Sequence, residues 1–454
     1  MADFKLKRGF HLQLAGAARR ELADAPRPAT VAVQPADFRG VRLGPAVNEG
    51  DRVQIGTPIL RSKDRADWVF AAPAAGQVTA VRRGPRRALE AIVITPDAEP
   101  AALAFKRWTE AELAQLSREA ALGQLLASGM LWLFRERPFG YVANPDHAPR
   151  DIFVSTLETA PLGAEPALIV AGQERFVQAG LEVCKRLTAG HVHVAVDGRP
   201  NRQAPAVFTS VPGVQVHRFA GPHPAGCVGV QIHHIAPIRG RTDVVWCVSV
   251  QGLIILGKLF VNGMIDPAVT VAVAGSGALD RRHFRTVLGA DVNSLTGGQL
   301  APGELRRISG NVLTGRQVGP DGHVGLYDNL LTVIPEVTEP EFLGWTMPGL
   351  RKQSWFPAFL SRLLPGQEFV QHTGLNGGHR ALVATGVYED VVPMDILPEY
   401  LVKSCLIGDL EEMEQLGLYE VTEEEVALCD YVCPSKTEFQ QIIRAGLDHL
   451  ARES

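Results

Sequence analysis

The chain has 454 residues, enough for three or four domains that each bury a core of their own. Its 45 Lys and Arg are balanced by 49 Asp and Glu, and the formal charge of −4 provides no broad basic surface, which argues against nucleic acid as a partner. The 45 Gly and 31 Pro predict many turns and short strands, so we expect a mixed, multidomain α/β fold.

Residues 30–97 alternate apolar and polar side chains between frequent turns, which predicts a compact antiparallel barrel or sandwich. The stretch KDRADWVFAAPAAGQVTAV (63–81) has the layout of a lipoyl- or biotinyl-type carrier, in which a lysine at a hairpin tip precedes a strand and an Ala-Pro-x-x-Gly turn. Here Arg65 occupies the tip. Because a guanidinium stays protonated and is a poor nucleophile, we predict that this barrel carries no lipoyl or biotinyl group.

From about residue 100 the pattern becomes that of an α/β unit. Thr109 and Glu112 have capping-box spacing at the start of a helical stretch. Further on, PALIVAG (166–172), ERFVQAGLEVCKRLTAG (174–190) and HVHVAV (191–196) predict a strand, a helix and a strand.

This predicted unit lacks the loop that a dinucleotide or flavin site needs. Such a site has closely spaced glycines after the first strand, whose N–H groups reach the pyrophosphate at a helix N-terminus. Only Gly172 follows the predicted strand. Asp197, after the next strand, is weak evidence for a ribose-binding acid by itself, so we expect no bound nucleotide.

The most apolar stretch, VVWCVSVQGLIILGKLFVNGMI (244–265), is interrupted by Gln251, Lys258 and Asn262. With these interruptions it lacks the about 20 consecutive apolar residues of a membrane span, and it predicts a buried strand followed by a helix. Short strands broken by Gly and Pro over 268–336 then predict a small mixed β domain.

The last eighty residues are predicted to be helical. Capping-box spacing recurs at Thr422 with Glu425 and at Ser435 with Glu438. The final helix carries an apolar stripe at helical spacing, formed by Phe439, Ile442, Ile443, Gly446, Leu447 and Leu450. The stripe is available for a partner surface, although packing within its own domain is the expected alternative.

Five potential zinc ligands gather in VHRFAGPHPAGCVGVQIHH: His217, His223, Cys227, His233 and His234. Their spacings match no standard zinc site, and the Gly-Pro-His-Pro-Ala-Gly stretch is typical of a shaped loop. We therefore expect a structural loop and no bound metal.

Three of the six cysteines lie near the C-terminus. Cys429 and Cys433 form a Cys-x-x-x-Cys-Pro motif, which ends a ferredoxin-type cluster run, but the preceding Cys-x-x-Cys-x-x-Cys element is absent. With Cys405 the region is one thiol short of a cluster set, so we expect no iron–sulfur centre and reduced thiols throughout.

Four motifs in this order carry a specific resemblance. They are GPHPAG, EFLGWTMPG (341–349), NGGHRALVATGVYEDVVPMDILP (376–398) and EEEVALCDYVCPSK (423–436). Together they resemble the A subunit of the Na+-translocating NADH:quinone reductase, a family related to the C subunit of the Rnf complex and to the flavoprotein subunit of complex I. Two features depart from the family pattern: Gln231 stands where His-x-His is expected, and LRKQSWF follows the second motif.

The resemblance implies four segments: a lipoyl- or biotinyl-like barrel (1–99), a Rossmann-like α/β domain (100–256), a β-grasp domain of the soluble-ligand-binding type (257–340) and a C-terminal helical domain (341–454). It also implies a peripheral, cofactor-free subunit of a sodium-pumping NADH:ubiquinone reductase that has six subunits in all. NADH, flavins, Fe–S and ubiquinone then belong to the whole complex, and we assign no catalytic, cofactor-binding or metal residue to this chain.

The partners implied are the other subunits, with ubiquinone as a further candidate. The N-terminal residues show no signal peptide, so the expected location is the cytoplasmic face of the bacterial inner membrane, reached only through partner subunits. Two alternatives remain. An Rnf-type electron-transfer subunit would need eight tightly spaced cysteines for two clusters, and a free-standing carrier or ligand-binding protein is weakened by the missing lysine.

Overall fold

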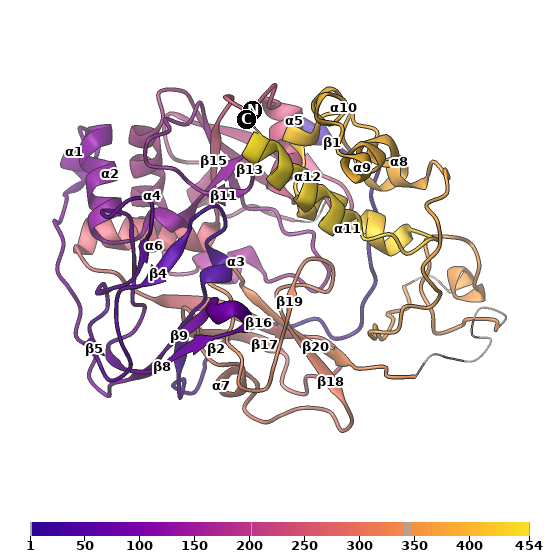
Figure 1. Ribbon diagram of the computed structural model, residues 1–454, viewed down its shortest axis with the longest axis horizontal. Coiled ribbons are helices and arrows are strands. Elements are labelled where there is room, and N and C mark those ends of the chain that lie inside the picture. Colours follow the sequence, from indigo (N-terminus) through magenta and orange to yellow (C-terminus); the bar gives the residue numbers. More distant parts are fainter. Residues whose placement is uncertain are drawn as a thin grey trace.

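The structure is a computed structural model that describes residues 2–200, 202–339, 341, 344, 347–364 and 366–453. Over these residues the strands form sheets of seven, six, four and three strands. Figure 1 shows helices around the largest sheet, with the smaller sheets below it and the C-terminal helices at the upper right.

Two small sheets build the predicted barrel. They enclose a core that includes Phe38, Ile59 and Phe70. One sheet has the order β3 (Val31–Val33), β9 (Leu89–Pro96), β8 (Gly76–Arg83) and β5 (Arg52–Val53); the other has the order β4 (Leu43–Pro45), β6 (Pro58–Ser62) and β7 (Val69–Ala71).

Arg65 lies in the turn between β6 and β7, where the sequence predicted the carrier tip. Its Nε is 2.7 Å from a carboxylate oxygen of Asp67, and another guanidinium nitrogen pairs with Asp146. These hydrogen bonds raise the pKa of Arg65 further above its usual range. The side chain at this tip is therefore a cation held by two carboxylates and not a nucleophile.

The largest sheet has a mainly parallel core. Strands β1, β14, β13, β12 and β15 run parallel, and β10 joins β15 in the antiparallel direction. The order is β1 (Ala2–Lys5), β14 (Val214–Ala220), β13 (Val192–Asp197), β12 (Ile152–Ser155), β15 (Val245–Val248), β10 (Phe134–Arg137) and β11 (Tyr141–Val142).

The helices of this region are α1 (Glu110–Leu113), α2 (Arg118–Ala127), α3 (Pro166–Val170), α4 (Glu174–Leu187), α5 (Val228–Ile235) and α6 (Val250–Asn262). The Thr109–Glu112 capping box is present at α1, and the apolar stretch after residue 244 forms β15 and α6 as predicted. No helix in the described part of the chain has the length and apolar character needed to cross a membrane.

The prediction of a strand at PALIVAG is wrong. Residues Pro166–Val170 form α3, and the strand that precedes α4 in the sheet is β12. A short apolar run has no periodicity that separates a buried strand from a buried helical turn, and Pro166 at the first helical position favours the helix.

The third sheet is formed mostly by the predicted β region. Its order is β19 (Arg316–Val318), β18 (Leu305–Ser309), β20 (Leu330–Pro335), β16 (Ala268–Ala274), β17 (Arg282–Val287) and β2 (Arg19–Asp24), with α7 (Val292–Thr296) beside it. Strand β2 pairs with β17, and β1 pairs with β14, so the first residues join sheets formed by later segments. The four domain boundaries stay a prediction.

The C-terminal helices are α8 (Val387–Val391), α9 (Pro398–Ile407), α10 (Leu410–Gln415), α11 (Glu423–Val432) and α12 (Phe439–Glu453). Phe439, Ile443, Leu447 and Leu450 of the apolar stripe are buried against the same helical cluster, which confirms packing within the domain. Part of the EFLGWTMPG motif (342, 343, 345 and 346) lies outside the described residues.

One of the two C-terminal capping boxes is confirmed. Thr422 and Glu425 cap α11 reciprocally. Ser435 instead donates its hydroxyl to the Ala381 carbonyl, so its predicted capping role is wrong. The first N–H groups of α12 are accepted by Asp430 of the preceding helix, a tertiary partner that the local spacing does not reveal.

Helices α4 and α6 approach closely through two glycines. A Cβ at Gly180 would lie 2.4 Å from the Leu253 carbonyl oxygen, and one at Gly257 would lie 1.9 Å from the Phe176 carbonyl oxygen. Both obstacles are backbone atoms, so a side chain would force the helices apart.

We expect Gly257→Ala to lower the thermal unfolding midpoint because the α4–α6 contact must open. Gly123→Ala is the matched control: it lies inside α2 with no atom within 4 Å of an added Cβ. At position 123 alanine is a better helix former than glycine, so the free energy of unfolding should stay unchanged or rise by about 0.5–1 kcal/mol. Equal effects of the two substitutions in calorimetry would contradict the close-contact explanation.

Candidate functional site

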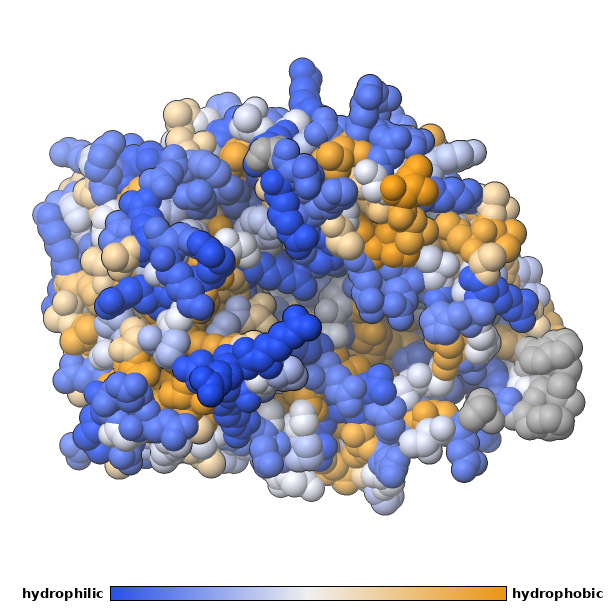
Figure 2. Space-filling view, in the orientation of Figure 1, coloured by the Kyte–Doolittle hydropathy of each residue, from blue (hydrophilic) through white to orange (hydrophobic). Residues whose placement is uncertain are grey.

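A cavity of about 340 Å³ lies between the seven-stranded and six-stranded sheets. Figure 2 shows the molecule hollowed near the middle of the displayed face. Val269 and Leu330 from the six-stranded sheet line one side, Ser155 and Val248 from the large sheet line another, and Glu424 at the start of α11 completes the wall.

The cavity lies at the topological switch point of the large sheet. From β12 the chain continues to β13 and β14 on one side, whereas β15 pairs with the opposite side of β12. The residues after the carboxyl ends of β12 and β15, which are 156–160 and 249–252, therefore separate and line the opening between them. Open α/β sheets bind ligands at this position.

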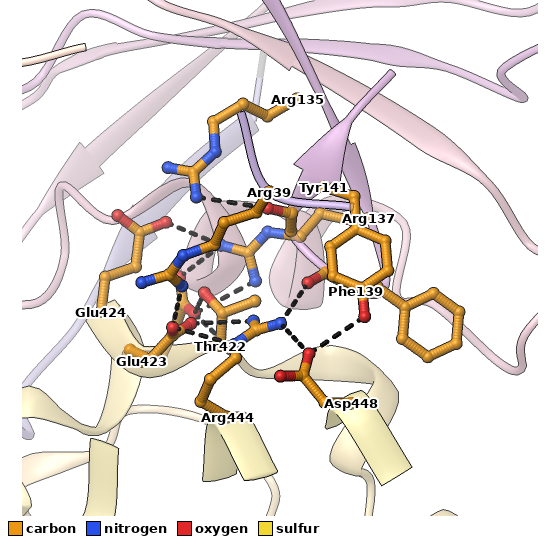
Figure 3. Close-up of polar contacts among 12 residues, drawn as sticks. Arg39, Arg135, Arg137, Phe139, Tyr141, Thr422, Glu423, Glu424, Arg444 and Asp448 are labelled. Carbon is orange, nitrogen blue, oxygen red and sulfur yellow. Dashed lines mark hydrogen bonds and ion pairs between the residues drawn. The ribbon is translucent and has the colours of Figure 1, made fainter. Parts of the chain in front are cut away.

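The buried Arg137 side chain connects this sheet with the C-terminal helices (Figure 3). Its guanidinium donates to Glu424 at 2.7 Å and to both oxygens of Glu425 at 3.0 and 3.1 Å. Glu425 also accepts from the backbone N–H groups of Thr422 and Gly229. Burial alone would lower the pKa of Arg137, but the two carboxylates raise it, so the cation persists.

A second ion network lies beside the first. Arg444 of α12 forms two hydrogen bonds of 2.9 Å to Glu423, which also pairs with Arg39. Tyr141 donates to Asp448 at 3.0 Å (Figure 3). Burial raises the pKa of Glu423, but the Arg444 hydrogen bond and charge outweigh it and hold that pKa at about 2. The β10–β11 hairpin is thus tied to α11 and α12.

His223 presents an unsatisfied polar atom at the cavity. Its side chain is 4% exposed, and its Nδ1 lies 3.2 Å from the Thr159 hydroxyl. Its Nε2 has no hydrogen-bond partner among the described residues. Burial lowers the pKa of His223 to about 4, so the ring is neutral at physiological pH and offers one donor or acceptor to a ligand.

Glu158 gives the cavity a group that titrates near neutrality. It lies in the loop after β12, where one carboxylate oxygen accepts from the backbone N–H of Ala160 at 2.7 Å. Burial raises its pKa to about 7. Below that pH the carboxyl group is neutral and can donate a hydrogen bond.

Cys227, Glu424 and Glu425 have side-chain ligand atoms within 4.8 Å of one another. Burial raises the pKa of the Cys227 thiol well above its usual value, and both oxygens of Glu425 already accept from Arg137. Metal binding requires a thiolate and free carboxylate oxygens, so a metal here would have to displace the ion pair.

The histidines singled out by the sequence do not converge. His217 lies on β14 with its Nε2 3.1 Å from Nδ1 of His193, away from the cavity lining. His233 contacts Glu420 at 2.7 Å, and His234 contacts the Pro393 carbonyl oxygen at 2.9 Å. Of these four histidines, His223 alone lines the cavity, so the cluster is mostly a set of contacts between elements.

Cys429 and Cys433 are buried in the helical core. Cys433 lies 3.2 Å from the Tyr388 hydroxyl and accepts from the N–H of Thr437. No sequence pattern assigned a role to Arg137, Glu158 or Glu424. Their importance depends on distant partners, although Glu424 lies within the motif at 423–436 and beside the Thr422–Glu425 capping box.

The comparisons with known proteins match these segments to one family. Residues 4–97 match the model of the NqrA N-terminal barrel-sandwich hybrid domain, 116–265 that of the NqrA second alpha/beta domain, and 270–319 that of the NQRA C-terminal domain. Proteins named as the A subunit of the Na(+)-translocating NADH-quinone reductase are 38% identical in Pasteurella multocida and 36% identical in Saccharophagus degradans, each covering 99% of both chains.

The chain belongs to this family. The predicted resemblance and the mixed α/β fold class are therefore confirmed. Among solved structures, an NAD+-reducing [NiFe]-hydrogenase in the air-oxidized state has a TM-score of 0.36 at 11% identity, covering 49% of this chain and 47% of the other.

We expect Arg137→Met to destabilise the protein by about 3–5 kcal/mol, because it leaves Glu425 charged and buried without its partner. The readout is the thermal unfolding midpoint. Arg42→Met is the control, since it removes an exposed pair with Asp64 and such pairs contribute little. Equal midpoints for the two variants would show that the Arg137 pair does not hold the helices to the sheet.

Proposed function

We propose that this chain is a peripheral, cofactor-free subunit of the sodium-pumping NADH:ubiquinone reductase, where it supports electron transfer to quinone coupled to Na+ export. The observation that carries the proposal is similarity over 99% of both chains to proteins named as the A subunit of that enzyme. NADH oxidation, flavins, Fe–S and the sodium path then lie on the other members of an assembly of six subunits, and this chain lies at the cytoplasmic face of the inner membrane.

Three features support a cofactor-free role. Arg65 replaces the carrier lysine and is clamped by two aspartates. The segment before α4 is the short helix α3, with no glycine-rich loop to hold a pyrophosphate. Cys429 and Cys433 are buried among apolar side chains and do not present a cluster of thiolates.

We further propose that the cavity takes the ring of ubiquinone. Quinone sites are shaped apolar clefts with a few placed polar groups. Here Trp132, Ile169 and Val250 supply apolar walls, while His223 and Glu158 supply groups that can hydrogen-bond a carbonyl oxygen.

The assignment to the reductase is tested by removing the chain from its host. NADH oxidation with artificial acceptors should remain largely intact, because electron entry lies on other subunits, and Na+-dependent quinone reduction by membranes should collapse. A detergent pull-down of the tagged chain should recover the other subunits. Recovery of the chain alone, together with unchanged quinone reduction in its absence, would shift the assignment to a free-standing binding protein.

Quinone binding should depend on pH through Glu158. Its folded pKa of about 7 leaves it neutral and able to donate below that pH. The affinity of the purified chain for short-chain ubiquinone, read as quenching of Trp132, should therefore fall as pH rises through about 7.

The Glu158→Gln variant should remove that pH dependence, because its amide donates at every pH. Trp132→Phe reports how much of the quenching arises in the cavity. A pH profile that is unchanged in Glu158→Gln would exclude Glu158 as the donor, and quenching that persists in Trp132→Phe would place quinone elsewhere.

A further inference from the structure

The segment 347–383 combines exposed apolar side chains with positive charge. It lies at the right-hand end of the molecule in Figure 1, and its described residues include the short 3-10 helix η6 (Leu360–Leu363). Its exposed large apolar residues are Met347, Leu350, Phe356, Leu360, Leu363, Leu364, Val370, Leu375 and Val383. Exposed apolar side chains that gather in one region mark sites of interaction with proteins or membranes.

The charge of this segment is opposite to that of the whole chain. It holds four Lys and Arg against the single acid Glu368, whereas the chain carries −4. Lys352 pairs with Glu341. Arg351, Arg362 and Arg380 are exposed and form no ion pair with any described residue, so their charges face solvent without compensation.

The turn at η6 presents leucines and a cation together. Leu360, Leu363 and Leu364 are 51%, 75% and 48% exposed, and Arg362 lies between them in sequence. The turn is held to the segment by the Leu360 N–H, which donates to the Pro348 carbonyl at 2.9 Å, and by the Ser361 hydroxyl, which donates to the Lys352 carbonyl.

Contacts at both sides of the turn fix the segment to the body of the protein. The Phe369 N–H donates to the Gln13 carbonyl at 2.7 Å, and Trp355 packs edge-on against Phe10 with ring centroids 5.3 Å apart. The exposed leucines are therefore carried on an anchored loop.

We propose that segment 347–383 binds the anionic headgroup surface of the membrane, with the η6 leucines inserted at the acyl boundary. Leucine and phenylalanine side chains together with Lys and Arg are the composition of interfacial membrane anchors. Anionic headgroups attract Lys and Arg near the surface, whereas the cytoplasmic loops of membrane proteins are enriched in Lys and Arg and would repel this segment. The charge therefore favours lipid over an intramembrane partner as the occupant.

This inference rests on the proposed function, which places the chain at a membrane. It departs from the sequence-based expectation that the membrane is reached only through partner subunits, because it adds a direct lipid contact to those attachments.

The test is flotation of the purified full chain with vesicles of phosphatidylcholine, with and without phosphatidylglycerol. The chain should float only with the anionic vesicles and should be released by salt. Arg362→Gln should weaken the partition about fivefold, since a basic residue near an anionic surface contributes about 1 kcal/mol. The double variant Leu360→Gln/Leu363→Gln should abolish flotation.

Leu279→Gln and Arg61→Gln are the matched controls, because each removes an exposed side chain of the same kind outside the segment. Both should float like the unmodified chain, and the thermal midpoints of all variants should agree. No flotation, flotation independent of phosphatidylglycerol, or equal loss in the controls would overturn the proposal. If vesicles do not bind but the leucine variants no longer co-purify with the other subunits, the segment is a protein interface, and the assignment to the reductase stands while the lipid proposal fails.

Discussion

The architecture depends on the buried ion pair between Arg137 on β10 and Glu425 at the start of α11, with the more exposed Glu424 as a second partner of the guanidinium. Transfer of these charges out of water costs several kcal/mol per ion, and the cost is offset only where hydrogen bonds satisfy the groups. Here Glu425 accepts from Arg137, Thr422 and Gly229 together. A different placement of α11 would leave the charge of Arg137 or Glu425 buried without a partner. The pair therefore fixes the position of the C-terminal helices on the sheet.

The cavity follows from that placement and from the strand order. The separation of the loops after β12 and β15 opens the sheet at its switch point, the six-stranded sheet covers one side, and Glu424 of α11 covers another. The resulting site is polar at its rim of backbone and carboxyl groups and apolar at Trp132 and Ile169. The proposed quinone, a ring with carbonyl groups, would meet both the apolar walls and the polar groups of this lining.

Three places where the sequence suggested a carrier or redox group are occupied by packed side chains and helix in this chain. At the barrel tip Arg65 is paired with two aspartates. Before α4 a helical turn stands where a glycine-rich loop would be needed. Cys429 in α11 and Cys433 just after it are buried in the helical core. A scaffold role within a larger enzyme is consistent with all three, since none of them leaves a reactive group exposed.

The sequence by itself determined the local elements and the family. Alternation predicted the barrel, helical spacing and capping boxes predicted α1, α11 and the stripe of α12, and four ordered motifs indicated the family that the whole-chain similarity confirmed. It failed where the local signal was short or absent: PALIVAG became a helix, and Ser435 did not cap α12 because Asp430 did. Only the tertiary structure decided the candidate site. Arg137 and Glu425 are 288 residues apart, His223 and Thr159 are 64 apart, and no periodicity links such pairs. Their energies arise from burial and from opposite charges brought together by folding, which a linear pattern does not record.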